Sequence, residues 1–246
     1  MFQIFNKKKF LIDYLDGFID IHNHILPGVD DGAETVKDSL DLIKAFSEFG
    51  CYKFIATPHI MHNYYPNDPE SIGCALQELK NELVRNNLKN VSIRAAAEHM
   101  IDSNFESILA NGQIMPLAKN YLLVEMSYLQ ASINFEDAIQ GIASHRLFPI
   151  LAHPERYVFL HNRMRNYKGY KESGILFQLN FLSLTDYYGK EVQRASFKLL
   201  EEGLIDFIAS DVHNNVQINQ LKSARISKKT LDLIIPVINN TIANFL

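Results

Sequence analysis

The chain has 246 residues, of which 47% are hydrophobic, so it can bury a large core and is most simply one domain over residues 1–246. Its formal net charge of −4 provides no basic surface for nucleic acid, and we expect no nucleic-acid partner. No apolar run reaches the length of a membrane span and the N-terminus is a poor match to a signal peptide, so we expect no membrane insertion. The two cysteines, Cys51 and Cys74, are compatible with a reducing compartment, and we expect a cytoplasmic protein.

Apolar, strand-like runs alternate with amphipathic helical patterns along the chain. In order, the strand-like runs cover residues 18–24, 54–59, 95–98, 122–125, 150–154, 175–180 and 207–213. The helical patterns between and after them cover residues 34–49, 69–86, 103–111, 135–145, 155–173, 187–202, 216–228 and 229–244. This alternation predicts right-handed βαβ units around a parallel sheet, and seven repeats predict an α/β fold with a closed or nearly closed barrel.

Most of the strand-like runs end on histidine or carboxylate side chains. These are His22 with His24, His59, Glu98, Glu125, His153, and Asp211 with His213, and Asp31 follows shortly after the first run. Parallel strands buried on both faces present their C-terminal ends at one rim, so these side chains are expected to converge. Alternate residues on a strand point the same way, so His22 and His24 can bind one ion. Taken alone, His22 and His24 are equally well explained as two surface histidines. Asp211 and His213 are equally well explained as a hydrogen-bonded pair at a strand end. The same residue types at so many strand ends favour a metal site.

The candidate ligands are too many for one ion. Five histidines and four carboxylates suit two or three divalent cations, each with an open position for water or substrate. Four carboxylates against three divalent ions leave a net charge of about +2, which suits an anion such as a phosphate monoester. Imidazole and carboxylate ligands without thiolates favour Mn²⁺, Fe²⁺ or Zn²⁺ without selecting one of them.

Four motifs carry a specific family resemblance. They are HNHILPGVDDGA at residues 22–33, TPH at 57–59, HPER at 153–156 and SDVHN at 210–214, and segment 179–189 adds to them. They resemble the motifs of bacterial protein-tyrosine phosphatases of the polymerase-and-histidinol-phosphatase (PHP) superfamily that accompany capsule and exopolysaccharide synthesis, the CpsB/YwqE type. The resemblance implies a distorted (β/α)₇ TIM-like barrel with a trinuclear metal centre at the C-terminal ends of the strands. It also implies metal-dependent hydrolysis of phosphotyrosine on a bacterial tyrosine kinase, with Mn²⁺ as the expected metal.

The resemblance also implies roles for individual residues. As metal ligands it implies His22, His24, Asp31, His59, His153, Asp211 and His213, and, through weaker local matches, Glu98 and Glu125. It makes Arg156 the phosphate-contacting arginine, and we expect Arg156, Asp211 and His213 to act in catalysis. Family members often carry another arginine shortly after the last motif. This chain has none at residues 215–219, and its nearest cations are Lys222 and Arg225.

Two other functions stay open on the sequence. One is a small-molecule phosphatase, such as a histidinol-phosphate phosphatase, and the other is a metal-dependent phosphoprotein binder without turnover. A cysteine nucleophile is disfavoured, because the position six residues after each cysteine holds Thr57 or Lys80 where that mechanism needs arginine. We expect instead in-line attack on phosphorus by metal-activated water.

Four histidines lie outside the pattern of strand ends. We expect all four, His62, His99, His145 and His161, to be ordinary structural or surface residues, although His62 and His99 lie close enough to the motifs for contact with the site or its substrate to stay open. The aromatic segment 64–67 either lines a groove for a tyrosine-bearing peptide or packs as a rim loop.

Overall fold

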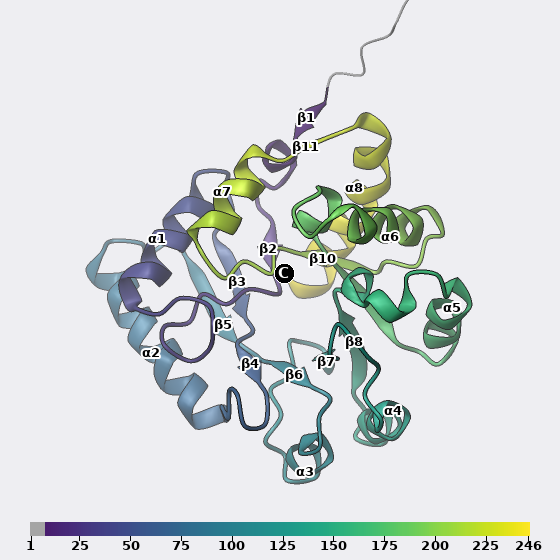
Figure 1. Cartoon of the computed structure of the whole chain (residues 1–246). Helices are drawn as coiled ribbons and strands as arrows, with labels where there is room; N and C mark the ends of the chain where they lie inside the picture. The colour runs from purple at the N-terminus through teal and green to yellow at the C-terminus, as the bar shows by residue number, and fades with distance from the viewer. Residues whose placement is uncertain (1–7) are drawn as a thin grey trace, which may run out of the picture.

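A barrel of parallel strands forms the centre of the computed structural model, which describes residues 8–246 (Figure 1). Its strands are β2 (Ile19–Asp20), β3 (Lys53–Ala56) with β4 (His59–Ile60), β5 (Ser92–Ala95) with β6 (Glu98–Met100), β7 (Tyr121–Glu125), β8 (Phe148–Ala152), β9 (Leu176–Asn180) and β10 (Phe207–Ala209). Hydrogen bonds order them as β2-β3-β5 and β10-β9-β8-β7-β6-β4, with every pair parallel.

Hydrogen bonds at two places join these two sheets into one closed barrel. The Ala96 amide donates to the Ala56 carbonyl at 2.8 Å, which continues β3 and β5 into β4 and β6. On the other side, the Asp211 amide donates to the His22 carbonyl at 2.8 Å, and the His24 amide donates to the Val212 carbonyl at 3.0 Å. The predicted seven-stranded α/β barrel is therefore confirmed.

Helices surround the barrel (Figure 1). They are α1 (Val36–Ser47), α2 (Pro69–Arg85), α3 (Phe105–Ala110), α4 (Phe135–Ser144), α5 (Met164–Glu172), α6 (Lys190–Glu201), α7 (Asn215–Ser223) and α8 (Lys228–Phe245). Their starts follow from local sequence, since Thr35 and Asp38 form a capping box on α1 and the Asn214 side chain accepts from two amides at the start of α7. Among residues 8–246, no helix is long and apolar enough to cross a membrane.

Three expectations about individual elements are wrong. The helix predicted over 155–173 is replaced by the 3₁₀ turns η2 (Pro154–Arg156) and η3 (Val158–Leu160) before α5, because His153 adopts a left-handed φ of 34° and turns the chain. The helix predicted over 216–228 stops at residue 223, where β11 (Arg225–Ile226) pairs antiparallel with β1 (Lys9–Phe10). His59 and Glu98 begin the short strands β4 and β6 instead of ending longer strands. Pro58, which lacks an amide donor, lies between β3 and β4 and interrupts the predicted run 54–59.

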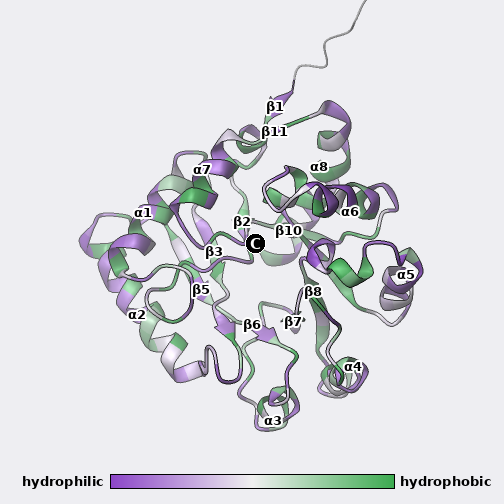
Figure 2. Ribbon diagram, in the orientation of Figure 1, coloured by the Kyte–Doolittle hydropathy of each residue, from purple (hydrophilic) through white to green (hydrophobic). Residues whose placement is uncertain are grey.

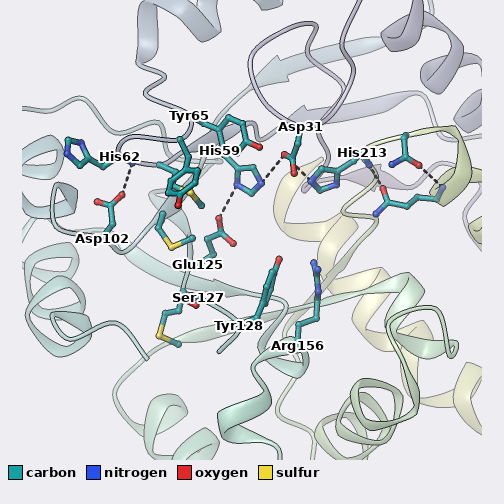
Figure 3. Close-up of a pocket in the computed structure, with 16 residues that line it drawn as sticks. Asp31, His59, His62, Tyr65, Asp102, Glu125, Ser127, Tyr128, Arg156 and His213 are labelled. Carbon is teal, nitrogen blue, oxygen red and sulfur yellow. Dashed lines mark hydrogen bonds and ion pairs between the residues drawn. The ribbon is translucent and has the colours of Figure 1, made fainter. Parts of the chain in front are cut away.

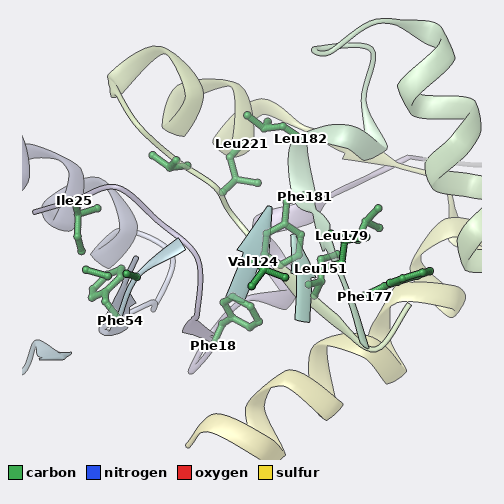
Figure 4. Packing of buried hydrophobic residues seen from close by; sticks show 14 of the residues in the cluster. Phe18, Ile25, Phe54, Val124, Leu151, Phe177, Leu179, Phe181, Leu182 and Leu221 are labelled. Atoms are coloured by element: carbon green, nitrogen blue, oxygen red, sulfur yellow. The ribbon is translucent and has the colours of Figure 1, made fainter. Parts of the chain in front are cut away.

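Apolar packing leaves only one end of the barrel for polar chemistry. The strands and inner helix faces bury aromatic and aliphatic side chains, with Phe18 and Phe181 in edge-to-face contact at 5.3 Å between ring centroids (Figure 4). Figure 2 shows the surrounding helices with both hydrophobic and hydrophilic faces. Phe245 of α8 packs against Tyr121 and Phe207, the first residues of β7 and β10, with centroids 5.5 and 5.1 Å apart. The N-terminal end of the barrel is therefore filled, and the ligand-bearing loops follow the opposite strand ends.

Candidate metal centre

The barrel brings the predicted ligands together at the C-terminal ends of its strands. His22 and His24 follow β2, His59 and Glu98 start β4 and β6, Glu125 ends β7, His153 follows β8, and Asp211 and His213 follow β10. All of these side chains are buried except that of His213, which is 14% exposed, and Asp31, at 53%, lies at the outer edge. The burial means that any charge here depends on close partners.

Potential ligand atoms form three overlapping groups. Within each group the atoms lie within 4.8 Å of one another: His24, Asp31, His59 and His213; His22, His24, Glu98 and Asp211; and His59, Glu98 and Glu125. His24, His59 and Glu98 each belong to two groups, as expected of ligands that serve neighbouring ions. His153 belongs to none, but its Nε2 lies 2.9 Å from Glu98 Oε1 and 3.8 Å from Glu125 Oε2.

Unpaired polar atoms show that the residues fit a metal. His59 Nδ1 lies 3.0 Å from Glu125 Oε1 and 3.2 Å from Glu98 Oε2, yet none of these three buried atoms makes a hydrogen bond. Their lone pairs converge without the alignment that a hydrogen bond needs, and a buried unpaired carboxylate oxygen is costly. A cation between them satisfies all three atoms, so the third group fits a divalent ion.

The charges of the site depend on the carboxylates. Burial opposes protonation of His22, but the Glu98 and Asp211 carboxylates outweigh it and raise the pKa of His22. Burial likewise opposes charging of His59, yet the Glu125 carboxylate contributes to a pKa of about 9. The same attraction holds the pKa of Glu98 and Asp211 well below their usual range, mainly through His22 against the opposing effect of burial.

Two outer residues orient the first pair of histidines. Gln178 Oε1 lies 2.7 Å from His22 Nδ1, and Asp30 Oδ2 lies 2.7 Å from His24 Nδ1, so the Nε2 atoms of both rings face the cluster. Asp30 also accepts from the amides of His59 and Gly32. Gly32 is required there, because a Cβ would lie 2.1 Å from the His24 carbonyl oxygen.

Sequence reasoning missed the roles of Gln178 and Asp30, although each left a signal. Gln178 is a polar residue inside the apolar run 175–180, and Asp30 is the first acid of the DDG motif. Backbone geometry was also missed. His153 and Asp211 have left-handed φ values of 34° and 52°, an unfavourable conformation for residues with a Cβ that is typical of functional sites.

Arg156 lies beside the cluster in a fixed position. Its Nη1 donates to Asp211 Oδ2 at 2.9 Å, and its guanidinium carbon lies 4.3 Å from the ring centroids of both Tyr128 and Tyr188. The Asp211 carboxylate raises the pKa of Arg156 against the effect of burial. Figure 3 shows Arg156 and Tyr128 side by side, extending toward Asp31 and His213.

The site opens into a cavity of about 670 Å³. Its walls include Met61, Tyr65, Met100 and Tyr128, and Arg156 is the sole lysine or arginine among the described residues that line it. Lys222 pairs with Glu48, and Arg225 lies over the Phe10 ring at 4.4 Å, so neither replaces the arginine missing after the last motif.

The remaining histidines and the two cysteines differ in whether they line the cavity. His62 lines the cavity, whereas His99 does not line it, is buried and bonds to the backbone. His145 and His161 contact backbone carbonyls away from it, as expected. Cys51 is buried and Cys74 is exposed, and neither lines the cavity.

Comparisons with known proteins agree with this arrangement. The model of the family described as "Capsular polysaccharide synthesis, CpsB/CapC" matches residues 18–230. The chain belongs to this family. It is 32% identical to the tyrosine-protein phosphatase YwqE of Bacillus subtilis over 80% of this chain and 77% of that protein. It is 29% identical, over the same shares, to a putative tyrosine-protein phosphatase, CapC, of Staphylococcus aureus.

A solved structure supports the fold of the CpsB/CapC family member. A chain from the crystal structures of YwqE from Bacillus subtilis and CpsB from Streptococcus pneumoniae, described as metal-dependent tyrosine phosphatases, superposes with a TM-score of 0.81. The sequences are 28% identical, and the match covers 92% of this chain and 94% of that chain. The barrel predicted from the motifs is therefore the fold of this family.

Proposed function

We propose that this protein is a metal-dependent protein-tyrosine phosphatase. The observation that carries the proposal is the position of Arg156 beside three overlapping ligand groups. The names of the relatives support it, since YwqE and the CpsB proteins are tyrosine-protein phosphatases. We further propose that residues 1–246 form one domain with this function.

The proposed ligands are the residues expected from sequence. They are His22, His24, Asp31, His59, Glu98, Glu125, His153, Asp211 and His213. Two or three divalent ions held by these residues would supply Lewis acidity and would activate water for attack on phosphorus. The mixed imidazole and carboxylate donors are compatible with Mn²⁺, which we propose as the native metal, with Fe²⁺ and Zn²⁺ as the alternatives to test.

Arg156 binds the phosphoryl group in this proposal. Its planar fork matches two phosphate oxygens, and Tyr128 and Tyr188 hold the guanidinium between their rings, so little side-chain entropy is lost on binding. Asp211 and His213 act in catalysis by holding the reacting centre next to this arginine. Asp211 does so directly through its hydrogen bond to Arg156.

The cavity suits an aromatic ester. The thioethers of Met61 and Met100 and the ring of Tyr65 provide an apolar wall for a phenyl ring. A tyrosinate leaving group, with a reference pKa near 10, needs less help from a general acid than an alkoxide does. Tyr64, 77% exposed at the cavity, indicates an opening at the surface that favours a protein segment over a small metabolite.

The proposed substrate is a phosphotyrosine on a bacterial tyrosine kinase of polysaccharide synthesis, and the proposed compartment is the cytoplasm. The family description supports the pathway, and the free cysteines Cys51 and Cys74 are compatible with a reducing compartment. The specific kinase is recognised by its phosphorylated tyrosine segment in this proposal.

Phosphate release tests the function. Protein reloaded with Mn²⁺, Fe²⁺ or Zn²⁺ is assayed with a phosphotyrosine peptide and with histidinol phosphate, alongside chelated protein. His22→Ala is the test variant, and His145→Ala, whose ring bonds only to its own helix, is the matched control. Release from the peptide that needs metal and His22 supports the proposal. Release only from histidinol phosphate assigns a small-molecule phosphatase, and peptide binding by the metal-loaded protein without turnover assigns a phosphoprotein binder.

A further inference from the structure

We propose that a groove next to the metal centre binds a cationic peptide segment that flanks the phosphotyrosine; this inference rests on the proposed function. The groove lies between the start of α3 and the loop that connects β7 to α4, with a volume of about 510 Å³. Its lining includes Asp102, Ser103, Glu106, Gln130 and Ile133.

The groove continues the cavity of the metal centre. Met100, Asp102 and Ser127 line both spaces, so a chain can pass from one to the other. Figure 3 shows Asp102 with His62 at the opposite side of the cavity from His213. The first cavity has a volume of about 670 Å³, which is sufficient for a phosphotyrosine side chain, so the groove provides room for the neighbouring residues.

The acidic lining of the groove favours a cationic peptide segment. Asp102 and Glu106 are its ionisable lining residues within the described chain, and both are acidic. Their hydrogen-bond donors are uncharged: Asp102 accepts from the amides of His62 and Asn104 at 2.7 and 2.8 Å, and Glu106 accepts from Asn134 Nδ2 at 2.7 Å. Two carboxylates that have no cationic partner among residues 8–246 attract lysine or arginine and repel acidic residues.

Large apolar side chains are exposed in and near the groove and the first cavity. Ile133, in the lining of the groove, is fully exposed, and Leu129, next to the lining residue Gln130 on the β7–α4 loop, is 82% exposed. Tyr64, 77% exposed, lines the first cavity. Exposed apolar groups beside a groove that also carries polar residues are typical of interaction sites. The methylene stems of lysine and arginine can pack on such groups while their charged ends reach the carboxylates.

Binding of matched peptides tests the groove. The peptides carry a non-hydrolysable phosphonate mimic of phosphotyrosine and differ only in lysine or glutamate residues on the N-terminal or C-terminal side. Fluorescence anisotropy measures Kd with metal-loaded protein at low and high salt. We expect a lysine flank on one side to bind about 3- to 10-fold more tightly than glutamate, with a smaller ratio at high salt, since each exposed ion pair contributes modestly.

Two variants and a control assign that preference to the groove. Glu106→Lys should reduce the ratio to about 2-fold or less, and Glu106→Gln, which keeps an oxygen for Asn134, should give an intermediate ratio. Glu78→Lys makes the same charge change on the exposed surface of α2 and should keep the wild-type ratio. Thermal melts confirm that each variant folds.

Either of two results overturns the inference: no flank preference in the wild type, or an unchanged preference in Glu106→Lys. Turnover of para-nitrophenyl phosphate by the wild type distinguishes this failure from failure of the proposed function. Turnover without a flank preference contradicts only the inference that the groove binds a cationic segment. Absence of aryl-phosphate turnover with every metal removes the proposed function as well.

Discussion

His99 lies in the middle of β6, directly after Glu98, and provides a prediction about acid stability. Its Nδ1 donates to the Leu123 carbonyl at 3.0 Å, and its Nε2 accepts from the Met115 amide at 3.2 Å. A carbonyl only accepts and an amide only donates, so these partners require the neutral ring. Burial is the main cause that lowers the pKa of His99 to about 4.

The pKa difference gives the sign and size of the effect. The unfolded chain protonates this histidine below about pH 6.5, whereas the folded chain does so only near pH 4. Between these values the unfolded state binds the extra proton, so His99 makes the free energy of unfolding decrease as the pH falls. Each unit of pKa difference corresponds to about 1.4 kcal/mol, so protonation of His99 lowers the free energy of unfolding by about 3 kcal/mol in total.

Urea unfolding of His99→Gln and wild-type protein, both chelated, measures this effect between pH 7.5 and pH 4. The wild type should be the more stable protein at pH 7.5, and the difference should shrink by about 3 kcal/mol by pH 4. His145→Gln, at the exposed C-cap of α4, is the control for the same substitution at the surface. A His99→Gln difference that stays constant over this range would refute a neutral, buried imidazole.

Three further predictions address the site. Arg156→Lys should lower kcat/KM for a phosphotyrosine peptide about 100-fold at unchanged metal content. The reason is that lysine loses both the two-point contact with phosphate and the stacking on Tyr128 and Tyr188. Steady-state kinetics and metal analysis of the same samples measure this. Metal affinity should rise from pH 7 toward pH 9, because the ion displaces the proton of His59, whose pKa is about 9 without metal. Calorimetry in buffers of different ionisation enthalpy should detect the release of this proton on metal binding. Cys51→Ala and Cys74→Ser should keep the wild-type kcat. A large decrease in kcat in either folded variant would instead support a cysteine nucleophile.

Much of the fold and of the ligand set follows from local patterns. Alternating runs predict the barrel, and parallel strands place their C-terminal ends at one rim. Even His24 and His213, far apart in sequence, could therefore be predicted as neighbours. The helix predicted over 155–173 failed because periodicity does not register the left-handed turn at His153. Whether the gathered residues bind ions stays a prediction that metal analysis tests.

The surroundings of Arg156 could not be predicted in the same way. Tyr128 and Tyr188 follow different strands and have no periodic relation to the arginine, so their common position depends on how the loops fold over the barrel. Gln178 and Asp30 were missed for a related reason. A sequence shows that a polar residue interrupts an apolar run, but the distance to its partner is set by the strand register and by loop closure.

Asp211 connects the ligand cluster with the proposed phosphate-binding arginine. Its Oδ1 lies 3.3 Å from His22 Nε2 and 3.4 Å from His24 Nε2, whereas its Oδ2 accepts from Arg156 at 2.9 Å and from Asn180 Nδ2 at 2.6 Å. One oxygen thus faces the proposed ions and the other orients the arginine. Because the carboxylate is buried and rigidly bonded, removing it disturbs both functions at once, so loss of activity in an Asp211 variant would not by itself identify a metal ligand. Metal content and the effect of Arg156→Lys, measured in the same Asp211→Asn background, would separate the two contributions.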